Sequence, residues 1–154
     1  MLTGISLDAH PFAEDRPLWL GCLLWPDEKG LSGHSDGDVV AHVVCEALLS
    51  ATGLGDLGSV FGVDKPEHKN ITGTNMLKQI SQVISDAGFQ IENVAVQVIC
   101  QKPAIAPRRL ESQSALTQAL GSPVHLTATS TDGMGFTGRS EGIAAIASAL
   151  VVKK

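Results

Sequence analysis

The stretch His34-Ser35-Asp36-Gly37-Asp38-Val39-Val40-Ala41-His42 joins a polar turn to the start of an apolar segment. The spacing Ser35-x-x-Asp38 has the form of a capping box, and a carboxylate is favourable near a helix N-terminus. These features predict a helix that continues to Ser50 and ends near Gly53. Because most of its surface is apolar, we expect this helix to be buried.

Polar side chains nevertheless recur at every fourth position of this helix and form one ridge along it. The ridge consists of Asp38, His42, Glu46 and Ser50. An unpaired polar group in a protein interior costs roughly 2–7 kcal/mol. Each member of the ridge therefore needs a hydrogen bond or a metal ion, and we expect the chemistry of the protein to lie there.

Length and composition indicate a single domain over residues 1–154. A chain of this length can bury a substantial core. Its 44% hydrophobic and 18% charged residues are typical of a folded globular protein and exclude a disordered one. The formal net charge of −5 offers no positive surface to a polyanion, so we expect no nucleic-acid partner.

The sequence shows no sign of a membrane segment or a signal peptide. Its longest apolar stretch, residues 143–152, is too short to cross a bilayer. The N-terminal segment carries Asp8 and His10 and lacks a basic region. Three cysteines without C-x-x-C spacing are typical of free thiols in a reducing compartment. We therefore expect a cytoplasmic protein with no membrane partner.

The periodicity of the chain predicts an α+β domain with a mixed sheet and three main helices. Residues 2–10 alternate between apolar and polar, as in a half-buried strand that Pro11 ends or bulges. Strand, helix and strand in the C-terminal half predict a βαβ crossover. Further strands are expected at 18–20, 22–25, 91–100 and 124–129, and a turn at 26–30. One helix is expected to be capped by Thr74 and followed by Gly88, and another to run from Pro107 to Gly121 with Leu110, Leu116 and Leu120 on its inner face. Residues 143–152 fit either a helix or a strand.

Three side chains have the spacing of a metal site. Asp8 and His10 are two apart on the first strand and so share a face, and His42 on the ridge is a third candidate ligand. One carboxylate and two imidazoles suit zinc, and three protein ligands leave the open position of a catalytic site. Taken singly, Asp8 could cap a turn, His10 could lie on the surface, and His42 could be a hydrogen-bonded core histidine.

Four motifs extend this pattern over nearly the whole chain. They are Asp8-Ala9-His10-Pro11-Phe12, Lys29-Gly30-Leu31 leading to His34-Ser35-Asp36-Gly37-Asp38 and His42, Gly55-Asp56-Leu57-Gly58, and Gly135-Phe136-Thr137-Gly138-Arg139-x-Glu141-Gly142. Together they resemble the 2-C-methyl-D-erythritol 2,4-cyclodiphosphate synthases of the non-mevalonate isoprenoid pathway.

The resemblance implies a trimer-forming lyase, with active sites between neighbouring subunits. The substrate would be 4-diphosphocytidyl-2-C-methyl-D-erythritol 2-phosphate, whose 2-phosphate attacks the β-phosphorus so that CMP leaves and a cyclic diphosphate forms. Because the nucleophile is already an anion, catalysis would come mainly from positioning and from neutralisation of phosphate charge. The alternatives are a zinc-dependent phosphoester hydrolase and a non-catalytic trimer that binds isoprenoid diphosphates.

The resemblance also implies roles for single residues. Zinc would be held by Asp8, His10 and His42, and His34 and Ser130 would stabilise the transition state. Asp132 would hold a second divalent ion, magnesium or manganese; without the resemblance, residues 129–132 would be an ordinary polar strand end. Phe136 and Arg139, with Glu141, would lie near the trimer axis beside a cavity for isoprenoid diphosphates. The residues expected to contact substrate are Asp8, Ala9, His10, His34, Ser35, Asp56, Leu57, Gly58, Asp64, Thr129, Ser130, Thr131, Asp132, Phe136 and Arg139.

Several positions depart from the family pattern. Asp132 replaces a usual Glu, and Ser130 replaces a usual Thr but keeps the hydroxyl group. In the loop expected to hold cytosine, Ala104 stands where the family has lysine, yet cytidine remains the expected nucleotide because backbone groups read much of the base. Asp64 would take over a sugar contact after a shift of one residue. Ser6 replaces a usual glycine before the metal pair.

Overall fold

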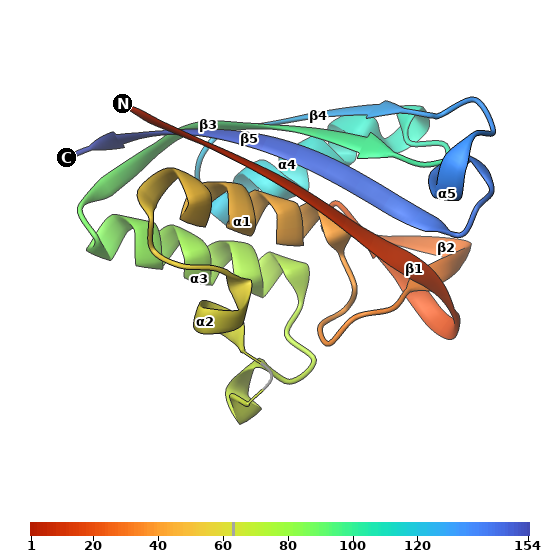
Figure 1. The fold of residues 1–154 in the computed structure, drawn as a ribbon, viewed down its shortest axis with the longest axis horizontal. Coiled ribbons are helices and arrows are strands. Elements are labelled where there is room, and N and C mark those ends of the chain that lie inside the picture. The colour runs from red at the N-terminus through yellow and green to blue at the C-terminus, as the bar shows by residue number, and fades with distance from the viewer. Residues whose placement is uncertain (63) are drawn as a thin grey trace.

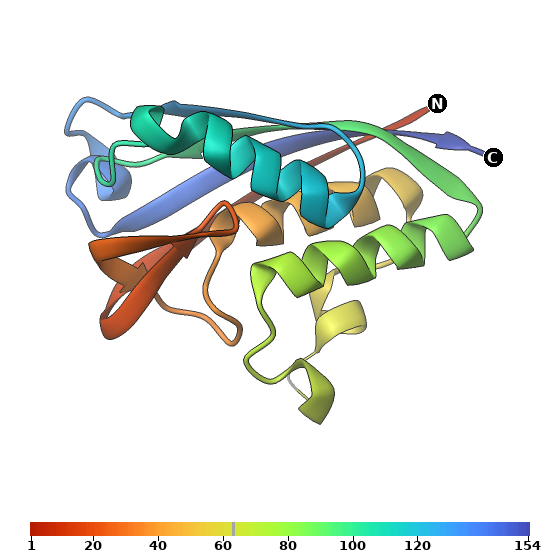
Figure 2. The same cartoon turned by 180° about the vertical axis from the view of Figure 1, so that it is seen from behind.

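The computed structural model describes residues 1–62 and 64–154, and within them five strands form one mixed sheet in the order β2-β1-β5-β3-β4. Three main helices lie along the same side of this sheet (Figures 1 and 2). This arrangement confirms the predicted α+β fold. The strands are β1 (Leu2–Leu20), β2 (Leu23–Leu31), β3 (Phe89–Ile99), β4 (Val124–Thr129) and β5 (Gly142–Lys153); the main helices are α1 (Val39–Thr52), α3 (Gly73–Asp86) and α4 (Arg109–Leu120); the short ones are α2 (Leu57–Phe61), η1 (Pro66–His68), η2 (Ala106–Arg108) and α5 (Gly135–Gly138).

Residues 143–152, which fit either a helix or a strand by periodicity, form a strand in the structure. Residues 143–152 belong to β5, which runs antiparallel to β1 on one side and to β3 on the other. β5 lies between two partner strands, and α1 packs on its inner face. Its apolar side chains are therefore buried, although their spacing is not that of a helix. β3 and β4 pair in parallel and are joined by α4, which confirms the predicted crossover.

The N-terminal hairpin differs from prediction. β1 continues through Pro11, and its register shifts instead around Pro17. The predicted turn at 26–30 is wrong, because β2 extends through this segment. Pro17 pairs with Lys29, whereas Leu18 pairs with Trp25, so residues 26–28 bulge out of the ladder.

The residues that cap the helices also differ from those predicted. α1 begins after Asp38, whose Oδ1 accepts hydrogen bonds from the backbone N–H groups of Val40 and Ala41, so Asp38 is the cap and Ser35 is not. α3 is capped by Thr72, not by Thr74. Leu110 is 66% exposed and lies outside the core, in contrast to its predicted place on the inner face of α4.

α1 is the buried centre of the helical layer, as predicted, and ten of its fourteen residues are buried. It packs against β1, where Gly4 faces the α1 backbone so closely that a Cβ atom would overlap Ala47 and Ala51. This close approach brings the inner face of β1 next to the polar side of α1.

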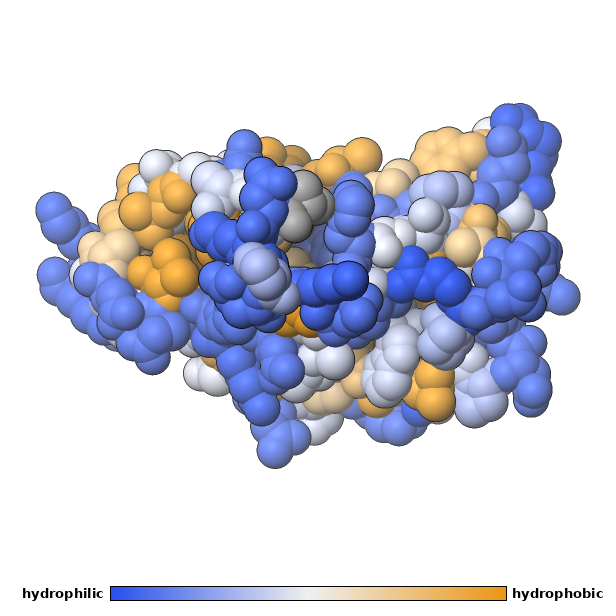
Figure 3. All heavy atoms as spheres, turned by 90° about the horizontal axis from the view of Figure 1, so that it is seen from below, coloured by the Kyte–Doolittle hydropathy of each residue, from blue (hydrophilic) through white to orange (hydrophobic). Residues whose placement is uncertain are grey.

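In the first half of β1, two apolar side chains face away from the helices, whereas Leu18 and Leu20 farther along the strand are buried in the core. Ile5 and Leu7 are 70% and 64% exposed, whereas Asp8 and His10 on the other face are half-buried beneath α1. In contrast, the side of the molecule opposite the sheet is mostly hydrophilic (Figure 3). No helix in the described part of the chain is long and apolar enough to span a membrane.

Candidate metal centre and adjoining cavity

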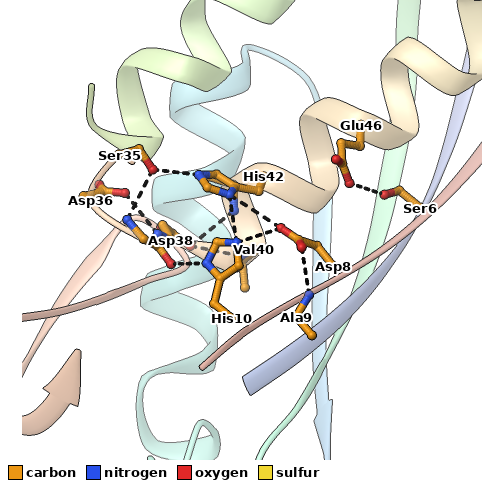
Figure 4. A network of polar contacts seen from close by, with 12 residues as sticks. Ser6, Asp8, Ala9, His10, Ser35, Asp36, Asp38, Val40, His42 and Glu46 are labelled. Atoms are coloured by element: carbon orange, nitrogen blue, oxygen red, sulfur yellow. Dashed lines mark hydrogen bonds and ion pairs between the residues drawn. The ribbon is translucent and has the colours of Figure 1, made fainter. Parts of the chain in front are cut away.

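The structure brings Asp8 and His10 of β1 together with His42 of α1 (Figure 4). Asp8 Oδ2 lies 2.9 Å from His10 Nε2 and 3.5 Å from His42 Nδ1, and the two nitrogen atoms are 3.2 Å apart. Their candidate ligand atoms all lie within 4.8 Å of one another. The predicted clustering of these three side chains is therefore present in a single chain.

The outward nitrogen of each histidine has a partner in the turn before α1. His10 Nδ1 lies 2.9 Å from the carbonyl oxygen of Gly37, and His42 Nε2 lies 2.7 Å from Ser35 Oγ. Such partners orient ligating imidazoles and raise their basicity. They leave His10 Nε2 and His42 Nδ1 directed at Asp8.

The charges of the cluster suit a cation. Burial would raise the pKa of Asp8, but hydrogen bonds from His10 and His42 and from the backbone N–H of Ala9 outweigh it and hold this pKa well below its usual range. Burial would lower the pKa of His10, but the hydrogen bond and the charge of Asp8 outweigh it and raise this pKa. Asp8 is therefore an anionic ligand at neutral pH, and one carboxylate with two imidazoles fits zinc with one open position.

The turn that supplies the outward partners is anchored on three sides. Arg16 donates to the carbonyl oxygens of Gly33 and Ser35, at 2.9 and 2.7 Å. Asp36 accepts a hydrogen bond from the backbone N–H of Gly73 at the start of α3, at 2.8 Å. Sequence reasoning gave Arg16 no role, because a long-range contact to two carbonyl groups leaves no mark in the local pattern.

Asp38 anchors the same turn to the β1–β2 hairpin. It is fully buried, and it accepts from the backbone N–H groups of Gly21 and Cys22 at 2.9 and 2.7 Å in addition to capping α1. Buried carboxylates need such compensation, because an unpaired charge in the interior is costly. Asp38 thus holds the start of α1, which carries His42, against the hairpin of the strand that carries His10.

The other two ridge residues, Glu46 and Ser50, lie outside the candidate metal centre. Glu46 Oε2 accepts a hydrogen bond from Ser6 Oγ at 2.7 Å, one turn of α1 beyond His42. This contact accounts for the serine at position 6, because Glu46 and the inner face of β1 meet there. Ser50 is exposed. Of the four ridge side chains, only His42 belongs to the candidate metal centre.

A cavity of about 270 Å³ opens beside the metal triad. Among the residues expected to contact substrate, it collects five from three different segments of the chain. The residues lining it are His10, Gly33, His34, Ser35, His42, Leu57, Gly58, Phe61, Gly62, His68, Ile71 and Met76. Sequence reasoning missed Phe61 and His68, because helical segments as short as α2 and η1 leave no periodic signal in the sequence.

A neighbouring cavity of about 500 Å³ places Asp64 near the same region. It shares His34, Phe61 and His68 with the first cavity and is also lined by Asp64 and Lys65. Asp56 occupies a different position. It caps α2, where its Oδ1 accepts from the backbone N–H of Ser59 at 2.8 Å, and it lines neither cavity.

The segment Thr129–Thr131 and Asp132 stand apart from the triad. In the described chain, none of these residues lines the cavity beside the triad, and Ser130 Oγ instead lies 3.4 Å from Asp132 Oδ1. One copy of the chain therefore does not assemble the whole predicted site.

Phe136 lies by a third cavity, of about 360 Å³, together with Ala9, Pro11 and Glu141. Arg139 is 64% exposed there and donates from Nε to Glu141 Oε2 at 2.8 Å. His10, the neighbour of Ala9 on β1, also lines this cavity. The residues predicted near a trimer axis thus lie beside one another at the surface.

Comparisons with known proteins agree with these features. A family model described as the YgbB family matches residues 1–152. The 2-C-methyl-D-erythritol 2,4-cyclodiphosphate synthase of Acidothermus cellulolyticus is 51% identical over 148 residues, which cover 96% of this chain and 92% of that protein.

Solved structures show the same fold. The bifunctional IspDF from Campylobacter jejuni aligns with a TM-score of 0.92 and 34% identity, over 99% of this chain and 42% of that one. This chain therefore spans less than half the length of that bifunctional protein. A 2C-methyl-D-erythritol-2,4-cyclodiphosphate synthase in a form bound to CDP aligns with a TM-score of 0.88 and 28% identity, over 97% of this chain and 99% of that one.

Proposed function

This chain belongs to the YgbB family, and from that premise we infer that it is a phosphorus–oxygen lyase of isoprenoid biosynthesis that forms 2-C-methyl-D-erythritol 2,4-cyclodiphosphate. Its substrate would be 4-diphosphocytidyl-2-C-methyl-D-erythritol 2-phosphate, and CMP would be released. The observation that carries the inference is the Asp8, His10 and His42 cluster beside a cavity lined by His34 and Ser35.

We propose that Asp8, His10 and His42 hold one zinc ion. When bound, zinc would supply a Lewis acid for the β-phosphate, and with a single carboxylate ligand the centre keeps a net positive charge. The donor set supports zinc, because both histidines direct one nitrogen inward while Ser35 and Gly37 contact the other. In a protein with net charge −5, this local positive charge would attract the diphosphate.

His34 would stabilise the charge that develops on the transferred phosphate. It is exposed and lines both cavities near the triad, so its ring is accessible to substrate. Leu57 and Gly58 at the start of α2 would contact the erythritol unit, and Asp64 in the neighbouring cavity would bind a hydroxyl group. Because both phosphates are anions before reaction, these groups act by positioning and by charge neutralisation.

We propose a homotrimer in which each site is completed by a neighbouring subunit. The apolar outer face of β1 supports this assembly, because Ile5 and Leu7 would otherwise remain in water. The neighbour would supply Thr129, Ser130 and Thr131 to the phosphates, and Asp132 to magnesium or manganese. Phe136 and Arg139 would lie around a central cavity for an isoprenoid diphosphate.

Cytidine is the proposed nucleotide. The solved synthase in its CDP-bound form supports this choice, since it aligns over nearly the whole chain. The three free cysteines support a place in the cytoplasm, where thiols stay reduced.

Product analysis tests the proposed reaction. The purified protein with zinc and magnesium is expected to convert the substrate into the cyclic diphosphate and CMP, with no oxygen from labelled water in the product. Incorporation of solvent oxygen without cyclisation would instead identify a hydrolase, and no turnover would favour a binding protein.

The variant His34→Ala checks the role of the ring. Turnover should fall by about 100-fold or more, because removing one preorganised stabilising group typically costs 10²–10³ in rate. The oligomeric state, measured by light scattering, should stay unchanged, because His34 is exposed. Undiminished turnover would show that the assignment is wrong.

A further inference from the structure

Among the described residues, one enclosed side-chain polar atom lacks a hydrogen-bond partner. It is Nδ1 of His68, at the end of the short helix η1. Nearly all buried polar groups in folded proteins are paired, so this exception calls for an explanation. His68 also lines the cavity beside the triad, and none of the roles proposed for the reaction uses it.

The backbone around His68 is held in place by the end of α2. The N–H of His68 donates to the carbonyl oxygen of Lys65 at 3.0 Å, and its carbonyl oxygen accepts from the N–H of Ile71 at 3.2 Å. Lys65 Nζ donates in turn to the carbonyl oxygens of Ser59 and Val60, at 3.2 and 2.9 Å. These contacts tie η1 to α2, which lies next to it (Figure 1).

The ring of His68 makes a T-shaped contact with Phe61, the last residue of α2. The ring centroids are 5.3 Å apart and the ring planes are inclined by 63°. In a neutral imidazole, one nitrogen donates a hydrogen bond and the other accepts one. An unpaired N–H group is rarer in a protein interior than an unpaired acceptor, so the enclosed Nδ1 carries the lone pair and Nε2 carries the proton. Within the described chain only Nδ1 is both enclosed and unpaired, so the proton on Nε2 is the one open to a ligand in the cavity.

The surroundings of His68 suit an uncharged ligand oxygen. The cavity groups suited to phosphate are the triad histidines and His34, whereas Leu57, Phe61 and Ile71 line the cavity with apolar side chains. In such a cavity, a few polar groups fix the orientation of the ligand. The neutral ring against Phe61 offers one donor, and a hydroxyl oxygen accepts it without bringing a charge among these apolar side chains.

We propose that His68 is a specificity-determining residue that donates a hydrogen bond from Nε2 to a hydroxyl oxygen of the erythritol unit. The inference rests on the proposed function, because it takes this cavity as the site of the erythritol unit. His68 lines both the cavity that contains Leu57 and the neighbouring one that contains Asp64, and both residues are proposed contacts of the same unit. A site built to bond a hydroxyl group rejects an analogue without it, because the donor is then left unpaired.

Three variants separate this hydrogen bond from the packing of the ring. His68→Phe keeps an aromatic ring against Phe61 but removes both nitrogens. His68→Gln carries an amide N–H group that reaches about as far from the backbone as Nε2 does. Glu67→Gln is the matched control, because Glu67 is exposed on the same short helix and lines neither cavity.

Two ligands separate the erythritol unit from the nucleotide. CDP contains the nucleotide and both phosphates of the diphosphate. 4-Diphosphocytidyl-2-C-methyl-D-erythritol adds the erythritol unit and cannot cyclise, because it lacks the 2-phosphate. Calorimetry with zinc and magnesium present measures the affinity of each variant for both ligands.

The loss should be confined to the ligand that carries the erythritol unit. His68→Phe should bind this ligand roughly 3–10-fold more weakly, as expected for one lost hydrogen bond, and should bind CDP like the wild type. His68→Gln should recover the affinity to within about twofold, since a neutral hydrogen bond is restored. Glu67→Gln should bind both ligands like the wild type.

Analogues that each lack one hydroxyl group of the erythritol unit test the contact in the wild type itself. One of them should bind the wild type roughly 3–10-fold more weakly than the complete ligand, and it should bind His68→Phe with the same affinity as the wild type. This analogue identifies the bonded oxygen. If no hydroxyl removal weakens binding to the wild type, the proposed hydrogen bond is absent.

The remaining outcomes separate this inference from the proposed function. Equal affinity of the wild type and folded His68→Phe for the erythritol ligand would overturn the role of His68 and leave the proposed function standing. A similar loss for CDP and for the erythritol ligand would also overturn it, because the effect would then lie with the phosphates or with packing. Failure of the wild type to bind either ligand would overturn the proposed function itself.

Discussion

At the scale of single residues, the site depends on the hydrogen-bond partners of Asp8, His10 and His42. Asp8 is anionic because His10 and His42 offset the cost of its burial. The outward nitrogens of both histidines are occupied by Gly37 and Ser35, which leaves the inward nitrogens for a cation. The direction of each imidazole is therefore decided outside the triad, in the turn before α1.

Removal of Asp132 should separate the two proposed metal ions. In Asp132→Ala, stimulation of turnover by magnesium or manganese should be strongly weakened, while bound zinc stays near one per chain, because Asp132 contributes nothing to the triad. Metal analysis by mass spectrometry together with magnesium titration of turnover measures both effects. Equal loss of zinc and magnesium dependence would contradict separate sites.

The cysteines should be unreactive in the folded protein. Burial, reinforced by the charge of Asp38, raises the pKa of Cys22 to about 12, and burial raises the pKa of Cys100 to about 11. The thiolate is the reactive form, so at pH 8 a disulfide reagent should modify both thiols roughly 100-fold or more slowly than an ordinary thiol. The rate should rise as pH approaches these values, and protein unfolded in urea is the control. Rapid modification of the native protein would show that these thiols are not protected.

At the scale of elements, α1 and the β1–β2 hairpin are joined by one carboxylate. Asp38 accepts from Gly21 and Cys22 of the hairpin turn and from Val40 and Ala41 of the helix. A helix cap normally serves its own helix alone. This one also fixes the helix relative to β1, and the triad needs ligands from both elements.

Loss of this carboxylate should therefore be costly. In Asp38→Ala, four backbone N–H groups lose their acceptor, and the free energy of unfolding in urea should fall by about 3 kcal/mol or more. Asp56→Ala is a matched control, because it removes the exposed cap of the short α2 and should cost about 1 kcal/mol. Similar losses in both variants would show that the contacts of Asp38 with the hairpin add little.

At the scale of the whole molecule, the sheet has one face covered by helices and one face open. The open face carries Ile5 and Leu7, whereas the helical side of the molecule is mostly hydrophilic (Figure 3). The segment from Thr129 to Asp132 lines no cavity at the triad of its own chain. Both features fit an assembly that buries the open face and shares its sites between chains.

A charge on the open face should break the assembly. Ile5→Lys is expected to shift the proposed trimer to a monomer in light scattering, because each buried isoleucine contributes about 1.5–3 kcal/mol and three copies would meet in that assembly. Leu110→Lys is the control, since Leu110 is about equally exposed but lies on α4. A wild-type monomer, or a trimeric Ile5→Lys, would contradict the proposed interface.

The sequence by itself determined what depends on neighbours along the chain. Asp8 and His10 share a face because strand side chains alternate, and Gly53 ends α1 because glycine adopts its left-handed conformation without strain. The buried character of α1 and the crossover from β3 to β4 follow in the same way from periodicity and order. The predicted turn at 26–30 failed because proline and glycine also occur in a bulged edge strand.

Only the tertiary structure decided what depends on contacts between distant segments. Residues 143–152 form a strand because β1 and β3 pair with it on both sides, which no local pattern reveals. The polar face of β1 turns inward because Gly4 admits α1 and His42 meets Asp8 there, so the apolar face is left open. Each of these outcomes depends on a partner dozens of residues away, and the energy of such a pairing exists only once the chain has folded.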